Sequence, residues 1–186
     1  MQFVFDERKA AQAAAKLLQL RGGTMPYIKL MNLLYLANRQ SLLEIGYPIT
    51  GDRLVSLDRG PILSKVLDFI TWGDFDANSA WPEYVSPKNG YDVSLNAEIE
   101  RDFDHLSEYE IGVLTEVDAR FGHLEWRVLV KFTHELPEWI DPHGSSIDID
   151  VRTILESAGK SAAEVEEVAS QVESIWTFKS AYAAVS

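Results

Sequence analysis

Residues 27–45 have the sequence YIKLMNLLYLANRQSLLEI and are followed by Gly46. Their apolar side chains fall on nearly every side of a 3.6-residue helix, and a helix without a polar face is normally the central, buried one. Thr24 can cap this helix, and Pro26 suits its first turn, where a missing N–H costs nothing. The rest of the chain is therefore expected to pack around residues 27–45.

Helices are also predicted on both sides of this segment. An alanine-rich run predicts one from about Asp6 to Leu20, ended by glycines at 22 and 23. Two capping boxes, in which a serine and a glutamate satisfy each other's free backbone donors, predict helix starts at Ser107 and Ser161. Apolar periodicity then predicts helices over residues 107–121, 124–135, 151–157 and 161–175.

Short strands are expected among these helices. Asp52–Asp58 alternates polar and apolar residues, which is typical of a half-buried strand. Residues 83–85 and 91–95 are two further strand candidates, with the hairpin turn signal Asn89-Gly90 between them. Gly60-Pro61 is interpreted as the start of a helix, with Pro61 at its first position.

The predicted fold class is mainly α (α+β), a helical bundle-like single domain with a small antiparallel β-sheet or hairpin. Residues 1–25 are expected to form an N-terminal helix packed on the domain, residues 26–175 the domain itself, and residues 176–186 a C-terminal tail. A hydrophobic fraction of 46% and a charged fraction of 25% fit a globular chain of this size.

The composition of the chain excludes several kinds of functional site and argues against others. The absence of cysteine excludes a disulfide scaffold, a thiolate metal site and a cysteine nucleophile. No run approaches the roughly 20 apolar residues of a membrane span, and charged residues follow Met1–Phe5 where a secretion signal would be apolar, so a cytoplasmic protein is expected. The net charge of −12 argues against nucleic-acid binding, which requires neutralisation of phosphates, and favours a basic protein partner.

Catalytic motifs are incomplete. Gly159-Lys160-Ser161 resembles the end of a phosphate-binding loop, but Ile154 replaces the glycine that the loop needs. His134-Glu135 resembles the start of a zinc-protease helix, but the second histidine would fall on Glu138. The sequence therefore predicts no catalytic residue, metal or cofactor. One enzymatic alternative stays open, a site assembled across the fold from Asp52, Arg53 and His134.

Five motifs occur in order along the chain: KLMNLLYLANR at 29–39, GYPITGDR at 46–53, RGPILS at 59–64, LSE at 106–108 and FTHELPEW at 132–139. Their order and spacing resemble the SocA-like Panacea domain from residue 26 to residue 175. Asn38 departs from the family pattern, which often has an acidic residue there, and Asp58 stands where an aromatic residue or histidine is common. The resemblance assigns structural roles to Tyr35, Gly51, Gly60, Pro61, His134, Glu135 and Trp139.

The resemblance implies an antitoxin without enzymatic activity that binds a cognate protein toxin directly. Family members occur beside toxin genes and on phage-like elements, and the SocA branch is described as a proteolytic adaptor that delivers its toxin to the ClpXP protease. A DNA-binding autorepressor, which would need a basic face on one helix, remains an alternative, and self-association into a homo-oligomer is left open.

Two stretches are expected to contact the partner. One is the turn and strand at 47–59, because an exposed strand edge can pair with another chain. The other is the aromatic C-terminal tail, because aromatic residues are favoured interface anchors. The alternative for this tail, which stays open, is a strand or helix packed on its own domain. The candidate residues are Tyr47, Thr50, Asp52, Arg53, Asp58, Arg59, Trp176, Phe178 and Tyr182.

Overall fold

The computed structural model describes residues 1, 3–96 and 103–183, with side chains described as far as residue 178. The elements in chain order are α1 (Glu7–Leu20), β1 (Thr24–Pro26), α2 (Tyr27–Ile45), β2 (Leu54–Leu57), β3 (Gly60–Leu63), α3 (Ser64–Trp72), α4 (Trp81–Tyr84), β4 (Asp92–Ser94), α5 (Glu108–Phe121), α6 (Trp126–His134), β5 (Ile147–Asp148), α7 (Val151–Ser157) and α8 (Ala162–Ala183). The described part is mainly helical with small antiparallel sheets, which confirms the predicted fold class.

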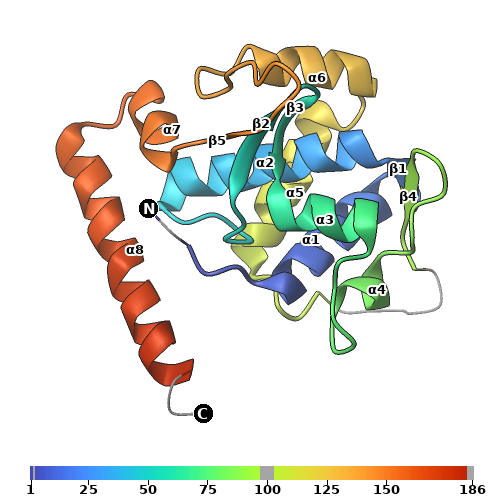
Figure 1. Cartoon of the computed structure of the whole chain (residues 1–186), viewed down its shortest axis with the longest axis horizontal. Helices are drawn as coiled ribbons and strands as arrows, with labels where there is room; N and C mark the ends of the chain where they lie inside the picture. Colours follow the sequence, from blue (N-terminus) through green and yellow to red (C-terminus); the bar gives the residue numbers. More distant parts are fainter. Residues whose placement is uncertain (2, 97–102, 184–186) are drawn as a thin grey trace.

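Helix α2 occupies the centre of the molecule, as its sequence predicts. It contacts α1, α3, α5, α6, α7, β1 and β3, and Figure 1 shows the other elements arranged around it. Nine of its apolar side chains are at most 6% exposed: Ile28, Leu30, Met31, Leu33, Leu34, Tyr35, Leu36, Ala37 and Leu42. Burial of apolar surface on all sides supplies the main driving force for docking the surrounding helices.

The strands form two antiparallel sheets. One has three strands in the order β3-β2-β5, and the other pairs β1 with β4. Asp52–Asp58 does contain a strand, but β2 is not half-buried, because Leu54, Val55 and Ser56 are all buried. The sheet packs on α2 and α6 through β3. Burial of the consecutive residues Leu54, Val55 and Ser56 shows that side chains on both faces of β2 are covered.

The prediction of a helix start at Gly60-Pro61 is wrong. These residues begin β3, which pairs with β2 in a hairpin whose turn is Asp58-Arg59, and the helix begins at Ser64 instead. Gly60 has φ of 102°, in the left-handed region, and a glycine just after a short turn is common in hairpins. Pro61 lacks an N–H, but β3 is an edge strand and tolerates it.

Other boundaries also differ from the sequence prediction. Residues 83–85 do not form a strand, since Trp81–Tyr84 is the short helix α4, and only an isolated bridge joins Val85 to Leu95. The strand predicted at 91–95 exists as β4, but its partner is β1. Thr24 therefore lies in a strand and does not cap α2, whose N-cap is Pro26. Residues 176–183 continue α8 and do not form a separate tail.

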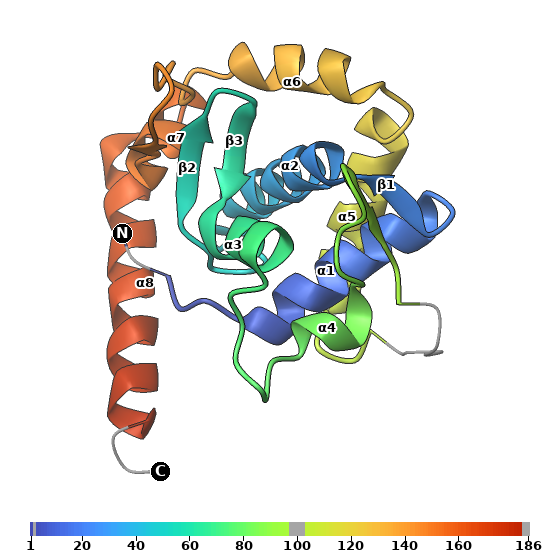
Figure 2. The same ribbon diagram turned by 45° about the vertical axis from the view of Figure 1, so that its right-hand side comes forward.

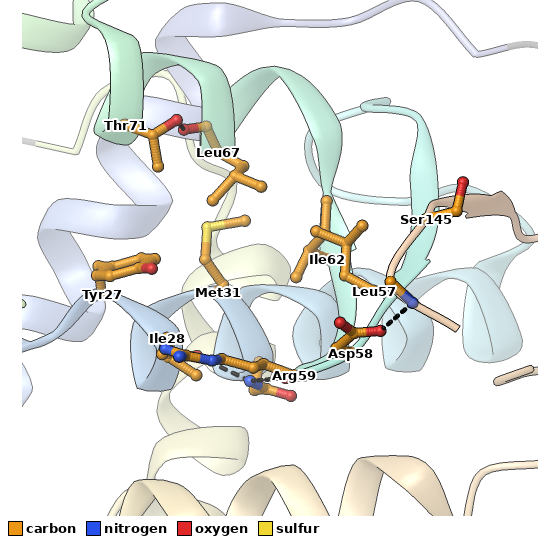
Figure 3. A pocket seen from close by; sticks show the side chains of 12 residues that line it. Tyr27, Ile28, Met31, Leu57, Asp58, Arg59, Ile62, Leu67, Thr71 and Ser145 are labelled. Atoms are coloured by element: carbon orange, nitrogen blue, oxygen red, sulfur yellow. Dashed lines mark hydrogen bonds between the residues drawn. The ribbon is translucent and has the colours of Figure 1, made fainter. Parts of the chain in front are cut away.

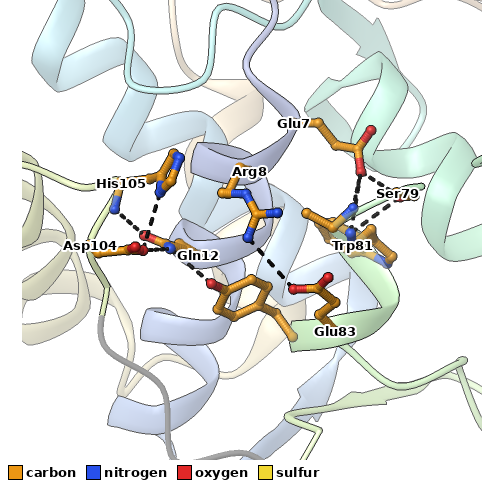
Figure 4. Close-up of polar contacts among 10 residues, drawn as sticks. Glu7, Arg8, Gln12, Ser79, Trp81, Glu83, Asp104 and His105 are labelled. Atoms are coloured by element: carbon orange, nitrogen blue, oxygen red, sulfur yellow. Dashed lines mark hydrogen bonds and ion pairs between the residues drawn. The ribbon is translucent and has the colours of Figure 1, made fainter.

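Helix α1 is fixed to α4 by a buried polar network (Figure 4). The Glu7 carboxylate accepts hydrogen bonds from the backbone N–H of Ala80 at 2.7 Å and of Trp81 at 3.3 Å, and it also contacts the Ser79 hydroxyl. The side-chain amide of Gln12, 0% exposed, donates to the Tyr84 hydroxyl at 2.9 Å. Because these buried groups are paired, the network ties α1 to the domain without an unsatisfied donor or acceptor at Gln12.

Both predicted capping boxes form. Glu110 N donates to Ser107 Oγ at 3.2 Å while Ser107 N donates to Glu110 Oε2 at 2.8 Å. Glu164 N donates to Ser161 Oγ at 3.3 Å while Ser161 N donates to Glu164 Oε2 at 2.7 Å.

Among the described helices, none combines the length and apolar character needed to cross a membrane.

Replacing Ser107 or Ser161 by alanine is expected to lower the free energy of unfolding by about 1 kcal/mol, because each change removes an N-cap. Urea denaturation followed by circular dichroism measures the effect. Thr115→Ala is the matched control, since its exposed hydroxyl bonds only a carbonyl of its own helix, and it should stay within about 0.5 kcal/mol of the parent. Equal midpoints for the parent and both serine variants would contradict the contribution of the boxes.

Candidate functional site

The β2–β3 hairpin is anchored to α2 and α6 at Gly60. Asn32 Oδ1 accepts a hydrogen bond from Thr133 Oγ1 at 2.8 Å, and Asn32 Nδ2 donates to the carbonyls of Ile28 at 2.8 Å and Arg59 at 3.4 Å. A Cβ at Gly60 would lie 2.6 Å from Asn32 Oδ1 and 2.7 Å from Thr133 Oγ1. The conformation and the close approach both require glycine at this position.

A buried carboxylate joins α2 to the segment after α6. Glu138 Oε1 accepts hydrogen bonds from the Tyr35 hydroxyl at 2.8 Å and from Arg39 Nε at 2.6 Å. The Glu138 side chain is 0% exposed and that of Arg39 is 19% exposed. Burial and the neighbouring Glu138 carboxylate raise the pKa of Tyr35 well above its ordinary value, so this phenol remains a hydrogen-bond donor.

His134 and Trp139 form a stacked pair beside the hairpin. Their ring centroids are 3.9 Å apart and the planes are inclined by 13°. Trp139 Nε1 donates to the carbonyl of Leu57 at 3.1 Å, which holds the pair against β2. Burial lowers the pKa of His134, although Asp141 and Asp58 act in the opposite direction. His134 Nε2 is buried and has no hydrogen-bond partner among the described residues, so the contacts that place the ring include its stacking on Trp139.

The turn before β2 is fixed between α2 and the N-terminal segment. Asn38 Oδ1 accepts from both the backbone N–H and the hydroxyl of Thr50, each at 2.9 Å. Gly51 has φ of 67°, and a Cβ there would lie 2.2 Å from the Val4 carbonyl oxygen. Thr50 and Gly51 therefore act as packing residues in this turn.

Asp52 caps the start of α3 from outside that helix. Its carboxylate accepts hydrogen bonds from the backbone N–H of Arg53 at 2.7 Å and of Lys65 and Val66, each at 3.1 Å. Burial raises the pKa of the Asp52 carboxyl group, while the three backbone donors act to lower it. Because its oxygens are occupied by backbone donors, Asp52 is placed for a structural role.

The three residues of the enzymatic alternative do not share one cleft. Asp52 and Arg53 line a surface cavity of about 580 Å³ at the start of β2. His134 does not line this cavity and lies near Asp58, at the other end of the strand. Arg53 is engaged with Asp148 and with the Ser64 hydroxyl, each at 3.0 Å. Within the described ranges, no three His, Cys, Asp or Glu side chains are placed to hold a metal ion.

Residues 30–140 match the family model described as "Antitoxin SocA-like, Panacea domain", which covers more than half of the chain. The chain belongs to this family. The matched segment begins in α2 and ends just after the Glu138 and Trp139 contacts, so it contains the polar anchors described above. No curated protein and no solved structure is significantly similar to the chain.

The Panacea segment presents only part of its predicted contact stretch to solvent. Thr50 and Asp52 are buried, whereas Arg53, Asp58 and Arg59 are exposed. Tyr47 is partly buried and packs edge-on against Phe3, with ring centroids 5.1 Å apart. Within the described residues β2 has no free edge, because it is paired with β3 on one side and with β5 on the other.

Outside the Panacea segment, α8 forms an arm that extends past the body of the molecule (Figures 1 and 2). Its first half packs on the body through Val165 and Val172, which are 1% and 3% exposed. Ile175, Trp176 and Phe178 are instead 38%, 43% and 73% exposed. We call this exposed segment, which consists of Ile175 and the two aromatic residues Trp176 and Phe178, the aromatic arm. Tyr182 lies in the last turn of α8, but its side chain is outside the described residues.

Several anchoring residues of the Panacea domain were not singled out from the sequence. Asn32 and Asn38 could have been found from the sequence, since both are amide side chains within the mainly apolar run of α2 that is predicted to be buried. Glu138 carried no periodic signal, because it follows the end of α6. Among the motif residues, Pro61 lies buried in β3, and Glu135 is exposed and serves as the backbone C-cap of α6.

Proposed function

We propose that this protein is a cytoplasmic antitoxin that neutralises a co-encoded toxin by direct protein–protein binding. The match to the SocA-like Panacea family over residues 30–140 carries the proposal. The dispersed positions of Asp52 and His134 agree with a binding role and not with catalysis, since catalytic groups must converge on one reacting centre. The partner is accordingly a protein toxin, and the reaction is association.

The aromatic arm is the surface we propose for the main toxin contact. Large aromatic residues supply much of the binding energy in protein interfaces, and exposed apolar patches often mark interaction sites. Glutamates at 164, 166, 167 and 173 are exposed on the same helix. Because complementary charge speeds association, a basic toxin surface is the best match.

Arg53 at the start of β2, and Asp58 and Arg59 at its other end, are further proposed contact residues. All three are exposed, while the rest of the 47–59 stretch is held inside the domain. Since β2 has no free edge, contact here would use side chains and not strand pairing. Removal of exposed charges at an interface rim mainly changes the association rate and its salt dependence.

The proposed function is tested by co-expression with the protein encoded by the adjacent gene. Toxicity of that protein alone, growth rescue by this chain and recovery of a stoichiometric complex are the expected results. A neighbour that is harmless alone, or rescue without any detectable association, would contradict direct neutralisation. We also propose delivery to ClpXP as a finer mechanism, for which the expected result is loss of rescue in a host without this protease.

The double variant Trp176→Ala, Phe178→Ala is expected to weaken toxin binding by about 30-fold or more, because paired aromatic anchors often act as hot spots. Isothermal titration calorimetry with the purified toxin measures the change. Trp72→Ala is the matched control, because Trp72 is 81% exposed but lies at the end of α3. If the double variant weakened toxin binding no more than the control does, contact of the toxin with the aromatic arm would be contradicted.

A further inference from the structure

A groove of about 310 Å³ opens between the turn of the β2–β3 hairpin, the first turns of α2, and α3 (Figure 3). Apolar side chains from these elements form most of its wall: Ile28, Met31, Leu57, Ile62 and Leu67. Polar atoms occur mainly at the rim, from Tyr27, Asp58, Arg59, Thr71 and Ser145. An apolar cleft near this size with a few polar rim groups has the character of a small binding pocket.

Among the residues that line the groove, Arg59 is a cation without a partner in the described part of the chain. Asp58 Oδ1 accepts a hydrogen bond from Gly144 N at 3.0 Å, and Thr71 Oγ1 donates to the carbonyl of Leu67 at 2.7 Å. The Arg59 guanidinium is exposed and makes no ion pair or hydrogen bond among the described residues, and Figure 3 shows its side chain extending toward Ile28. A guanidinium with unused donors is suited to a carboxylate, which it can bind through two parallel hydrogen bonds.

The surroundings of the groove reinforce its preference for an anion. The Nζ of Lys88 lies 5.7 Å from the centre of the Tyr27 ring, which lines the groove. Tyr27 and Ile28 are the first residues of α2, where the partial charge of the helix is positive. Asp58 is the opposing charge at the rim, but the Gly144 N–H is directed to it. Arg59 and the nearby Lys88 are thus two cations close to the groove, in a chain whose net charge is −12.

We propose that this groove binds the C-terminal residue of the toxin, with an apolar side chain in the groove and the terminal carboxylate on Arg59. The proposal rests on the proposed function and specifies its partner. A C-terminal residue places a carboxylate directly on the Cα that bears the apolar side chain. In an extended chain, by contrast, the side chains of neighbouring residues point to opposite faces, so an internal acidic neighbour would point away from Arg59.

The test uses the full-length protein and three probes, without the toxin. The probes are the peptide acetyl-Gly-Ser-Phe with a free C-terminus, the same peptide with a C-terminal amide, and 3-phenylpropionate. Binding is measured by titration in two-dimensional NMR spectra. We expect the free-acid peptide to shift signals of residues around the groove, and to bind at least about 10-fold more tightly than the amide, because the amide lacks the charge that strengthens hydrogen bonds to Arg59.

Two variants and one control locate the site. Arg59→Gln should weaken binding of the free-acid peptide about 10-fold, and Thr71→Phe, which places a ring at the mouth of the groove, should abolish it. Arg127→Gln is the control and should bind like the parent, because Arg127 is an exposed arginine on α6 that does not line the groove. Unchanged thermal midpoints confirm that each variant is folded.

Three outcomes would overturn the proposal: equal binding of acid and amide, unchanged binding by Arg59→Gln, or equal binding of 3-phenylpropionate and the peptide, which would indicate a site for small acids. Because no probe requires the toxin, failure of peptide binding together with successful growth rescue would reject this inference and leave the proposed function standing.

Discussion

Replacing Glu138 by alanine is expected to lower the free energy of unfolding by about 3 kcal/mol. The change leaves the buried Tyr35 hydroxyl without its acceptor and Arg39 without its counter-ion. A buried donor that loses its partner keeps the full desolvation penalty, and an uncompensated buried charge adds to it. The expected loss of stability lies near the lower end of the range of about 3 to 5 kcal/mol for removal of one partner from a buried ion pair. The reason is that Arg39, 19% exposed, can turn toward solvent.

Urea denaturation followed by tryptophan fluorescence measures this effect, and two further variants interpret it. Glu138→Gln keeps an acceptor for Tyr35 and removes only the charge, so it should lower the free energy of unfolding by about half as much as Glu138→Ala. Glu125→Ala removes the partner of Arg127 in an exposed ion pair, with side chains 57% and 69% exposed, and should change stability by less than about 1 kcal/mol. A loss as small for Glu138→Ala as for Glu125→Ala would contradict the buried network.

Replacing Gly60 by alanine is the second large effect, with an expected loss of about 3 kcal/mol. A φ of 102° strains any residue with a side chain, at a cost of about 1 to 2 kcal/mol. The new methyl group would also lie 2.6 Å from Asn32 Oδ1 and 2.7 Å from Thr133 Oγ1, so these groups must separate. Separation weakens a buried hydrogen bond, which adds about 1 to 2 kcal/mol.

A matched glycine distinguishes backbone strain from steric contact. Gly90 has φ of 61°, and a Cβ there would meet nothing within 4 Å. Gly90→Ala therefore carries only the strain and should cost about 1 kcal/mol. The midpoints of urea unfolding give both values. If the two alanine variants were equally destabilised, the contact of β3 with Asn32 and Thr133 would not contribute to the effect.

The anchoring residues and the aromatic arm lie on different sides of the boundary of the family match. Glu138 and Gly60 join α2 to segments that lie far from it in sequence, and both fall within the matched residues 30–140. The aromatic arm lies beyond that range. The family match thus covers the scaffold, and the surface that we propose for the main toxin contact lies on a helix outside it.

Local patterns in the sequence were sufficient for much of the architecture. The all-round apolar character of residues 27–45 predicted the central helix, because a helix without a polar face must be buried on every side. Ser107 and Ser161 marked two helix starts correctly, because a capping box is formed by residues three positions apart. The mainly α class with a small antiparallel sheet followed from the same short-range periodicities.

Contacts between distant segments decided the rest. Gly60-Pro61 is compatible with both a helix start and a strand, and its pairing with β2 and packing on Asn32 selected the strand. The strand character of Thr24–Pro26 depends on β4, about 70 residues away, and the role of Glu138 depends on Tyr35 and Arg39. Periodicity reports which face of an element is apolar, but strand partners and the acceptors of buried donors are set only when the chain has folded together.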